Sequence, residues 1–164
     1  MFLSNEIKIS YNVDKSGYQL TEKLSYETPS LKVDVPTLKE VGIHPYRWSR
    51  LTVPSGFIYK PESMRLSFIL RNLIDSDTYS KSYLMYDYIN WKIRVYKHDN
   101  HMYNSDSSIK NAKKLADKLF LDMIKIESSK YPISFWKWYL IKFFVRNFNG
   151  CMLITQQDDM TRIV

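Results

Sequence analysis

Two histidines and two aspartates are the side chains of this sequence best suited to hold a metal ion. His98 and His101 lie three residues apart in a run that also contains Asp99. Neutral imidazoles bind zinc and other transition metals, but further ligands would have to come from elsewhere, such as Asp87 or Asp117. Because the run is polar and turn-like, its two imidazoles need not point at one spot. The sequence therefore favours no metal site and leaves His98 and His101 as candidates.

The standard signatures of catalysis and cofactor binding are missing from the chain. With only 4 glycines there is no glycine-rich phosphate loop, and no Gly-x-Ser-x-Gly elbow is present. The single cysteine, Cys151, has no helper residue nearby in the sequence and can form neither an internal disulfide nor a thiolate metal cluster. We expect no cofactor. A reducing compartment fits this cysteine usage better than secretion, and we expect that the first residues are not a signal peptide, since they have no basic start and no apolar run.

A run of aromatic and basic residues towards the end of the chain is the clearest candidate for a binding surface. Aromatic residues make up 15% of the sequence, and Phe135-Trp136-Lys137-Trp138-Tyr139 forms the densest cluster. A helix that is apolar on all sides must be covered on all sides, so the segment is either a central core helix or a helix that offers one face to a partner or a membrane surface. Base stacking is a third interpretation. The residues expected to bind a partner are Trp136, Trp138, Tyr139, Lys142 and Arg146.

The charge of the chain permits several kinds of partner. The net charge is +7 and the pI is near 9.3, which attracts nucleic acid, anionic membranes or acidic proteins, although a lysine-rich surface also simply maintains solubility. Basic residues are interleaved with acidic ones, so there is no basic tail of the kind that binds nucleic acid by charge alone. The most apolar segment, 133–148, is short and carries three basic residues. We expect no transmembrane segment.

The residue pattern in the first third of the chain predicts β-strands. Polar and apolar residues alternate over 6–13 and, more weakly, over 18–26, which predicts a hairpin with its turn at 14–17. A third strand is predicted at 31–35, ended by Pro36, followed by a loop or short helical insert to residue 50. The next strand, 51–59, contains Pro54-Ser55-Gly56, which predicts a turn or bulge inside it.

The residue pattern in the remainder of the chain predicts mainly helices. Helices are predicted at 61–73, at 79–90 after a capping segment 75–78, and from Tyr131-Pro132 to Gly150, with short strands at 91–96 and 151–155. The clearest helix is 108–127. Its apolar stripe is formed by Ile109, Ala112, Ala116, Leu119, Met123 and Ile126. Its opposite, solvated face is formed by Lys110, Lys113, Lys114, Asp117 and Lys118.

The predicted fold class is α+β, with N-terminal antiparallel strands followed by a helical, bundle-like C-terminal half. We expect one domain over residues 1–164.

Four short motifs in a fixed order resemble a known family. They are Val53-Pro54-Ser55-Gly56-Phe57-Ile58 with a later Ser63, then Tyr86-Asp87-Tyr88-Ile89-Asn90, then Ala116-Asp117-Lys118-Leu119-Phe120, and finally Phe144-Val145-Arg146-Asn147-Phe148-Asn149-Gly150. Together they resemble the phage and prophage family catalogued as domain of unknown function 1353. The resemblance covers residues 51–150, and leaves 1–50 as a strand-rich part and 151–164 as a tail.

The resemblance implies a polar cluster in which two residues have been replaced. Family members have an aspartate where this chain has Lys60 and a histidine where it has Tyr86, while Asp87, Asp117 and Ser63 are retained. A lysine repels a cation where an anionic ligand would hold one, and a phenol is a poor base at neutral pH. Lys60 could instead pair with Asp87 or Asp117. The resemblance thus implies an inherited fold whose site is degenerate.

Two classes of function follow from these observations. The first is a non-catalytic, phage-encoded virion component or accessory protein that binds other virion or phage proteins as part of an assembly. The second is a metal-assisted hydrolase of cell-wall or similar polymers with a rearranged site, in which Asp87, Asp117 and Ser63 would be catalytic. A nucleic-acid-directed accessory factor is a weaker third option. We favour the first class, and with it a location in the virion, assembled in the host cytoplasm.

Overall fold

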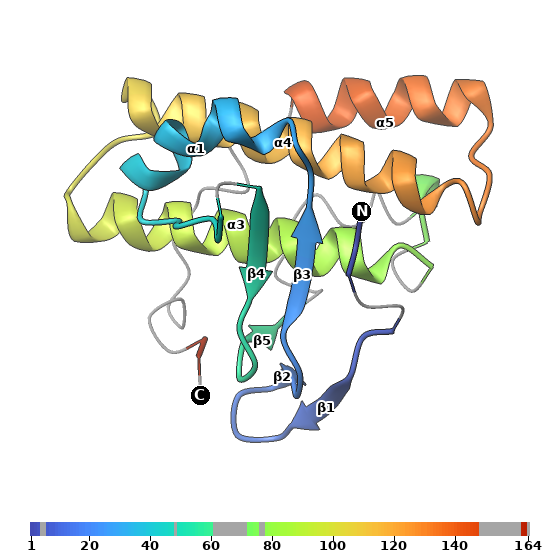
Figure 1. Ribbon diagram of the computed structural model, residues 1–164, viewed down its shortest axis with the longest axis horizontal. Coiled ribbons are helices and arrows are strands. Elements are labelled where there is room, and N and C mark those ends of the chain that lie inside the picture. Colours follow the sequence, from blue (N-terminus) through green and yellow to red (C-terminus); the bar gives the residue numbers. More distant parts are fainter. Residues whose placement is uncertain (4–5, 48, 61–71, 76–77, 148–161, 164) are drawn as a thin grey trace.

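The structure, a computed structural model, describes residues 1–3, 6–47, 49–60, 72–75, 78–147 and 162–163. Short antiparallel strands occupy the N-terminal part, and long helices the C-terminal half (Figure 1). The predicted α+β fold class is therefore confirmed. The expected helix at 61–73 lies almost wholly outside the described residues, as do the strand at 151–155 and the positions of Ser63, Gly150 and Cys151. No helix in the described ranges combines the length and apolarity needed to cross a membrane.

The strands of the described residues form two small antiparallel sheets. In the first, β1 (Ile9–Asn12) pairs with β2 (Gly17–Leu20), and β2 pairs with β5 (Ile58–Tyr59). The second consists of β3 (Leu24–Glu27) and β4 (Arg50–Val53). The predicted first hairpin is confirmed over β1 and β2, but its second arm does not extend to residue 26, because 24–27 form β3 of the other sheet. Gly17 is required where it stands, because a Cβ there would lie 2.7 Å from the Ile58 side chain across the sheet.

The predicted turn within the strand at 51–59 separates two strands that belong to different sheets. β4 ends at Val53 and β5 begins at Ile58, and between them Gly56 adopts a φ of 86°, which favours glycine. The Gly56 amide donates to the Leu20 carbonyl at 2.7 Å. The turn thus carries the chain from the β3–β4 sheet to the edge of β2.

The predicted strand at 31–35 is wrong, because this segment is helical. It belongs to α1 (Leu31–Glu40), which contains Pro36 within the helix. Leu31, Val35 and Leu38 are buried, at the i, i+4 and i+7 positions of one helical face, whereas Val33 is 84% exposed. The alternation of Leu31, Val33 and Val35 that suggested a strand therefore does not correspond to one buried face.

The predicted strand at 91–96 is also wrong. Residues 80–99 form one continuous helix, α3 (Ser80–Asp99), which is buried from Ser82 through Trp91 and again at Ile93 and Arg94. A helix enclosed on several sides carries apolar residues all round, and its sequence can then imitate the alternation of a strand.

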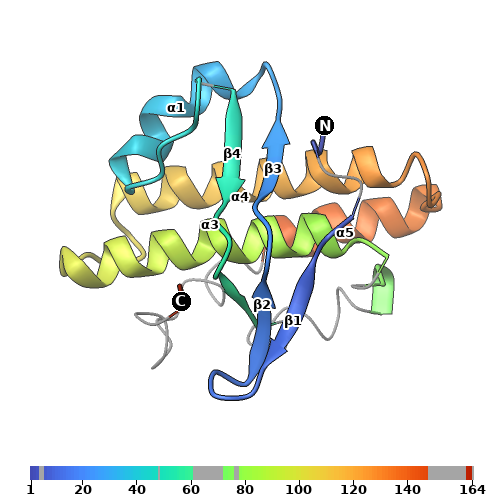
Figure 2. The ribbon, with the colours of Figure 1, turned by 60° about the horizontal axis from the view of Figure 1, so that its bottom comes forward.

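The central helix of the C-terminal half is α4 (Ser107–Glu127), as predicted. It contacts α1, α3 and α5 (Phe135–Asn147), and Figures 1 and 2 show α3, α4 and α5 lying side by side. The predicted apolar stripe is buried except at Ile126. The expectation that Lys113 and Asp117 lie on a solvated face is wrong, since both are buried between helices. Lys110, Lys114 and Lys118 are exposed, as predicted.

Candidate functional site

A buried polar centre lies where α3 packs against α4. The Tyr86 hydroxyl of α3 donates to Asp117 Oδ1 of α4 at 2.6 Å, and Lys113 Nζ donates to the Tyr86 oxygen at 2.9 Å. Lys113 also forms an ion pair with Asp117. The i, i+4 spacing of Lys113 and Asp117 places both on the same side of α4, facing Tyr86. The centre is thus a three-membered network of phenol, ammonium and carboxylate.

The tyrosine of this centre is fixed by packing. Its ring stacks on Phe120 at a centroid distance of 4.2 Å with an interplanar angle of 14°, and Lys113 Nζ lies 5.1 Å from the Tyr86 ring centroid. One turn along α3, Asn90 Nδ2 donates to the Tyr86 carbonyl at 2.7 Å. Tyr86 therefore fills the space between the helices as a core residue with a hydrogen-bonded hydroxyl.

Burial dominates the electrostatics of the centre. It raises the pKa of the Tyr86 phenol well above its ordinary value, and the neighbouring Asp117 adds to that rise. Burial also raises the pKa of the Asp117 carboxyl, against the opposing effect of Lys113, and lowers the pKa of Lys113, against the effect of Asp117. At neutral pH the phenol keeps its proton, so it donates a hydrogen bond and does not act as a base.

Asp87 belongs to a separate buried ion pair. Its Oδ2 accepts a hydrogen bond from Arg162 Nη1 at 2.8 Å, and its Oδ1 lies 3.9 Å from Arg94 Nη2. All three side chains are at most 3% exposed. The Arg162 backbone is held as well, because its carbonyl accepts a bond from the Ile58 amide at 2.6 Å. Arg162 thus links Asp87 of α3, through its side chain, to β5, through its backbone.

The sequence-predicted site residues do not form a joint metal-binding cluster in the described part of the chain. Asp117 is paired with Lys113, and Asp87 with Arg94 and Arg162, so each carboxylate faces cations of the protein itself. His98 and His101 are exposed at the end of α3 and in the turn after it. Among the described residues no group of three or more histidines, cysteines, aspartates or glutamates could hold a metal ion. Lys60 follows β5 and lies beside Gly17.

Sequence reasoning missed the cationic partners of both carboxylates. Lys113 could have been found, because a lysine four residues before an aspartate on a helix is a recognised pairing signal. Arg94 could also have been considered as a partner of Asp87, because it lies seven residues further along the same helix. Arg162 could not have been found in this way, since it lies 75 residues beyond its partner.

The aromatic helix α5 lies at the edge of the fold and is exposed on one side. Ile141 and Val145 are buried, and Trp138 and Phe144 pack against the core in part. Four aromatic residues of α5 stay in solvent: Phe135 is 86% exposed, Trp136 65%, Tyr139 66% and Phe143 50%. The alternative of a central core helix is therefore wrong for this segment, and the helix has a large aromatic surface available for contact.

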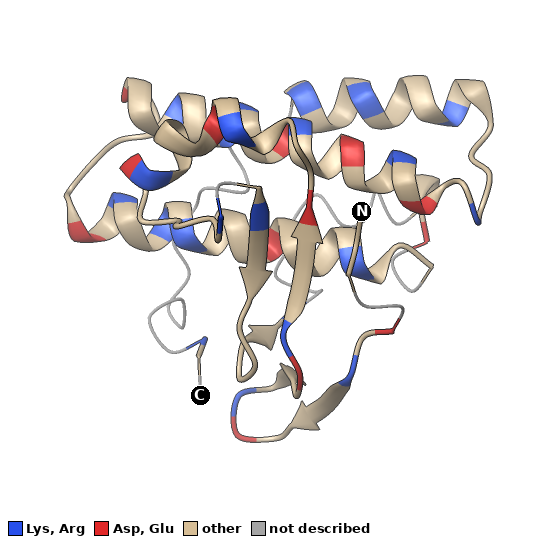
Figure 3. Ribbon diagram, in the orientation of Figure 1, with Lys and Arg blue, Asp and Glu red and all other residues tan. Residues whose placement is uncertain are grey.

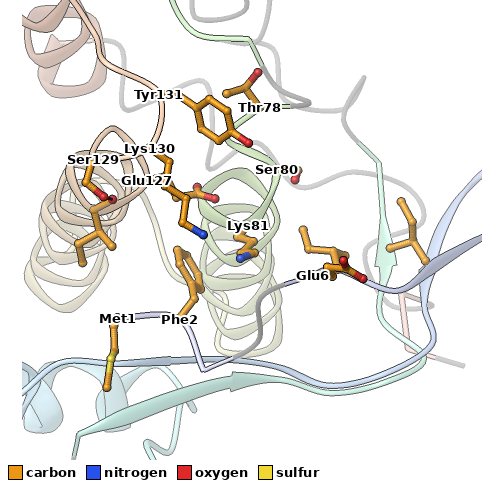
Figure 4. A pocket seen from close by; sticks show the side chains of 13 residues that line it. Met1, Phe2, Glu6, Thr78, Ser80, Lys81, Glu127, Ser129, Lys130 and Tyr131 are labelled. Atoms are coloured by element: carbon orange, nitrogen blue, oxygen red, sulfur yellow. Dashed lines mark hydrogen bonds between the residues drawn. The ribbon is translucent and has the colours of Figure 1, made fainter.

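A hollow of about 660 Å³ lies beside the start of α3 and the end of α4, within the size range of small-molecule sites. Figure 4 shows Phe2, Lys81, Glu127 and Lys130 around it. The Glu127 carboxylate accepts bonds from the Ser82 amide at 3.1 Å and the Ser82 hydroxyl at 2.5 Å. It thereby satisfies one of the N–H groups that a helix leaves unpaired at its first turn. The residues proposed from the sequence do not line this hollow.

Glu127 should make the stability of the protein depend on pH. Burial raises its pKa above the ordinary 4.5, against the effects of Ser82, Lys81 and Lys130. As the pH rises, the unfolded chain loses this proton first, so ionisation of Glu127 costs the folded state stability between pH 4.5 and the raised pKa. We therefore expect the free energy of unfolding of Glu127→Gln, relative to that of the wild type, to increase from about pH 4 to about pH 7. Urea denaturation of both proteins at the two pH values measures this difference, and a difference that is the same at both values would contradict the prediction.

Comparison with known proteins yields no relative. Models of protein families, curated protein sequences and solved structures all give no match to this chain. The resemblance to the phage and prophage family therefore stays a prediction. The function has to be inferred from the buried centre and from the exposed face of α5.

Proposed function

We propose that this chain is a non-catalytic, phage-encoded virion component or accessory protein that acts by binding another protein through α5. The exposed aromatic face formed by Phe135, Trp136, Tyr139 and Phe143 supports this proposal most directly. Soluble monomers seldom expose a contiguous apolar patch of this kind unless it contacts a partner. Tyrosine and tryptophan are also the residues that contribute most to binding energy at interfaces.

The buried centre supports the non-catalytic part of the proposal. Tyr86 occupies the position where the resembling family has a histidine, and its raised pKa keeps the phenol protonated. The two carboxylates that a hydrolase would need are each neutralised by protein cations and are shielded from solvent. In these arrangements both carboxylates are paired inside the core, whereas acid–base chemistry requires a group that can reach a substrate.

The phage origin of the proposal rests on the four motifs that resemble the family, and the location in the virion follows from that origin. Assembly would take place in the host cytoplasm, with other virion or phage proteins as partners. The net charge of +7 is compatible with this, because acidic proteins are among the partners that a basic surface attracts.

A photo-crosslinking experiment tests the proposed function. A benzophenone amino acid is placed at Trp136 or at Tyr139, in cells that produce the chain together with the virus or prophage that encodes it. A matched control probe is placed at Tyr103, which is 74% exposed in the turn between α3 and α4. We expect one protein to be crosslinked from both α5 positions and not from Tyr103, and to co-purify with virions or their assembly intermediates.

Three outcomes would contradict the proposal. Crosslinks that do not differ between α5 and Tyr103 would show that α5 is not the binding face. Crosslinks from α5 to lipid alone would assign the aromatic face to a membrane surface. Tight binding of Zn²⁺ or Mn²⁺ to the metal-free protein, measured by calorimetry, would favour the hydrolase alternative.

A further inference from the structure

A groove of about 630 Å³ runs between α4 and α5. Residues from both helices line it. From α4 come Lys114, Asp117, Lys118, Leu121, Asp122 and Lys125, and from α5 come Trp138, Lys142 and Arg146. Figure 1 shows the two helices side by side along most of the length of α5. The groove is thus built on two regular helices, which hold their side chains in fixed register.

The lining of the groove is predominantly basic. Five lining side chains are cationic and two, Asp117 and Asp122, are anionic. Asp117 is already paired with Lys113, and Lys118 also contacts Asp34 at 3.0 Å. Figure 3 shows basic bands and no acidic band along α5. The groove therefore presents a net positive charge to whatever enters it.

Part of the groove lining is apolar and continues into the aromatic face of α5. The apolar part of the lining consists of the buried Leu121 and the half-buried Trp138. Phe135, Tyr139, Lys142 and Arg146 follow one another at i, i+4, i+7 and i+11, so they share one stripe of α5. The exposed rings and the basic side chains of the groove wall thus form one continuous surface with an apolar part and a cationic part.

The length of the walls indicates the size of an occupant. Lys114 and Lys125 are separated by roughly 16 Å along α4 at a rise of about 1.5 Å per residue. Trp138 and Arg146 are separated by roughly 12 Å along α5 on the same basis. A helix of about three turns, or about eleven residues, matches this length.

We propose that the α4–α5 groove binds an acidic amphipathic helix of about three turns from the partner protein. Its apolar side would rest on Trp138, Leu121 and Tyr139, and its carboxylates would face Lys114, Lys125, Lys142 and Arg146. This inference rests on the proposed function and names the chemistry of the partner. Charge complementarity makes the groove select an acidic helix over a basic one, because a basic helix would meet like charges along both walls.

Two other occupants fit the groove less well. In a symmetric dimer built on this groove, the predominantly basic lining would face the same basic lining of the second copy, and like charges repel. Single-stranded nucleic acid is usually bound by rings on strands or loops beside a basic groove. Here the most exposed rings are on a helix, and the basic side chains of the groove wall come from two helices as well.

Fluorescence anisotropy with synthetic probes tests the proposal on the full chain. The first probe is a labelled helical peptide of about twelve residues with leucines on one face and glutamates on the other, and the second replaces each glutamate with lysine. A labelled oligothymidylate is the nucleic-acid probe. We expect only the acidic peptide to bind, and its affinity to fall as salt rises from about 50 to about 300 mM.

A pair of charge-matched variants locates the binding. Lys142→Glu with Arg146→Glu should weaken binding of the acidic peptide by about tenfold or more. The control, Lys15→Glu with Lys23→Glu, makes the same change in net charge near β1 and β2, at the opposite side of the fold from α5 (Figure 1). It should leave binding within about twofold, because its charges are distant and screened. Equal melting temperatures of the two variants exclude unfolding as the cause.

The outcomes separate this inference from the proposed function. Equal binding of acidic and basic peptides, no binding of either, or equal loss in both variants would overturn the inference. Binding of oligothymidylate that is lost in the Lys142 and Arg146 variant would overturn it in favour of nucleic acid. A protein crosslinked from Trp136 would still support the proposed function in each of these cases, whereas failure of that crosslink would reject the proposed function itself.

Discussion

Replacing Asp117 with alanine should lower the free energy of unfolding by about 3–5 kcal/mol. The substitution leaves the ammonium of Lys113 buried without its counter-ion, and it also removes the acceptor of the Tyr86 hydroxyl. Domains of this kind are stable by about 5–15 kcal/mol, so the loss is a large part of the total. Urea denaturation followed by tryptophan fluorescence measures it.

The double variant Lys113→Met with Asp117→Leu separates the ion pair from the packing. With both charges gone, apolar side chains of similar size should recover part of the loss. Adding Tyr86→Phe, which removes the buried hydroxyl left without either of its two partners, should bring the free energy of unfolding to within about 1–2 kcal/mol of the wild type. The control is Lys118→Ala, which removes an exposed pair with Asp34 and should cost about 1 kcal/mol or less. A triple variant that stays as unstable as Asp117→Ala would contradict the assignment of the loss to the unpaired Lys113 and Tyr86.

Replacing Arg162 with alanine should destabilise the protein by about 3 kcal/mol, because Asp87 then loses, inside the core, the nearer of its two cationic partners among the described residues. Arg94 remains, but its nearest nitrogen is 3.9 Å from the carboxylate. Asp87→Ala should be at least as damaging, since it leaves two buried guanidinium groups without that carboxylate. Thermal and urea denaturation of both variants measure the losses.

An exposed arginine provides the comparison for Arg162. Arg146→Ala on α5 should change the free energy of unfolding by about 0.5 kcal/mol or less, as surface substitutions usually do. A similarly small effect of Arg162→Ala would contradict the assignment of Asp87 to a buried ion pair. It would also remove one support for the non-catalytic function, because Asp87 would then be available for other contacts.

Periodicity predicted the fold where only one pattern was present. The stripe of α4 has a single period and was read correctly, and the Pro54-Ser55-Gly56 turn was recognised from its residue types. Two patterns overlap in α1, where Leu31, Val33 and Val35 alternate while Leu31, Val35 and Leu38 share a helical face. Only burial decides between such patterns, and the exposure of Val33 settles this case.

The candidate site was predictable in its residue types and not in its partners. Tyr86, Asp87 and Asp117 were identified as a polar set, and the structure places all three in the buried interior. Their adjacency to Lys113 depends on how α3 packs on α4, which the sequence pattern does not specify. Asp87 and Arg162 are 75 residues apart in the sequence, so their pairing depends on the fold bringing distant segments together, for which the local sequence has no signal.

The separation of the two buried ion pairs has a consequence for the folding kinetics. The Tyr86–Asp117 contact closes 31 residues of chain and the Asp87–Arg162 contact closes 75, which costs roughly 0.8 kcal/mol more in loop-closure entropy. The α3–α4 contact therefore has the advantage in an early, partly formed nucleus. On this basis we expect the loss of Asp117 to slow folding and the loss of Arg162 mainly to speed unfolding. Two buried contacts of similar depth would thus act on opposite directions of the same reaction.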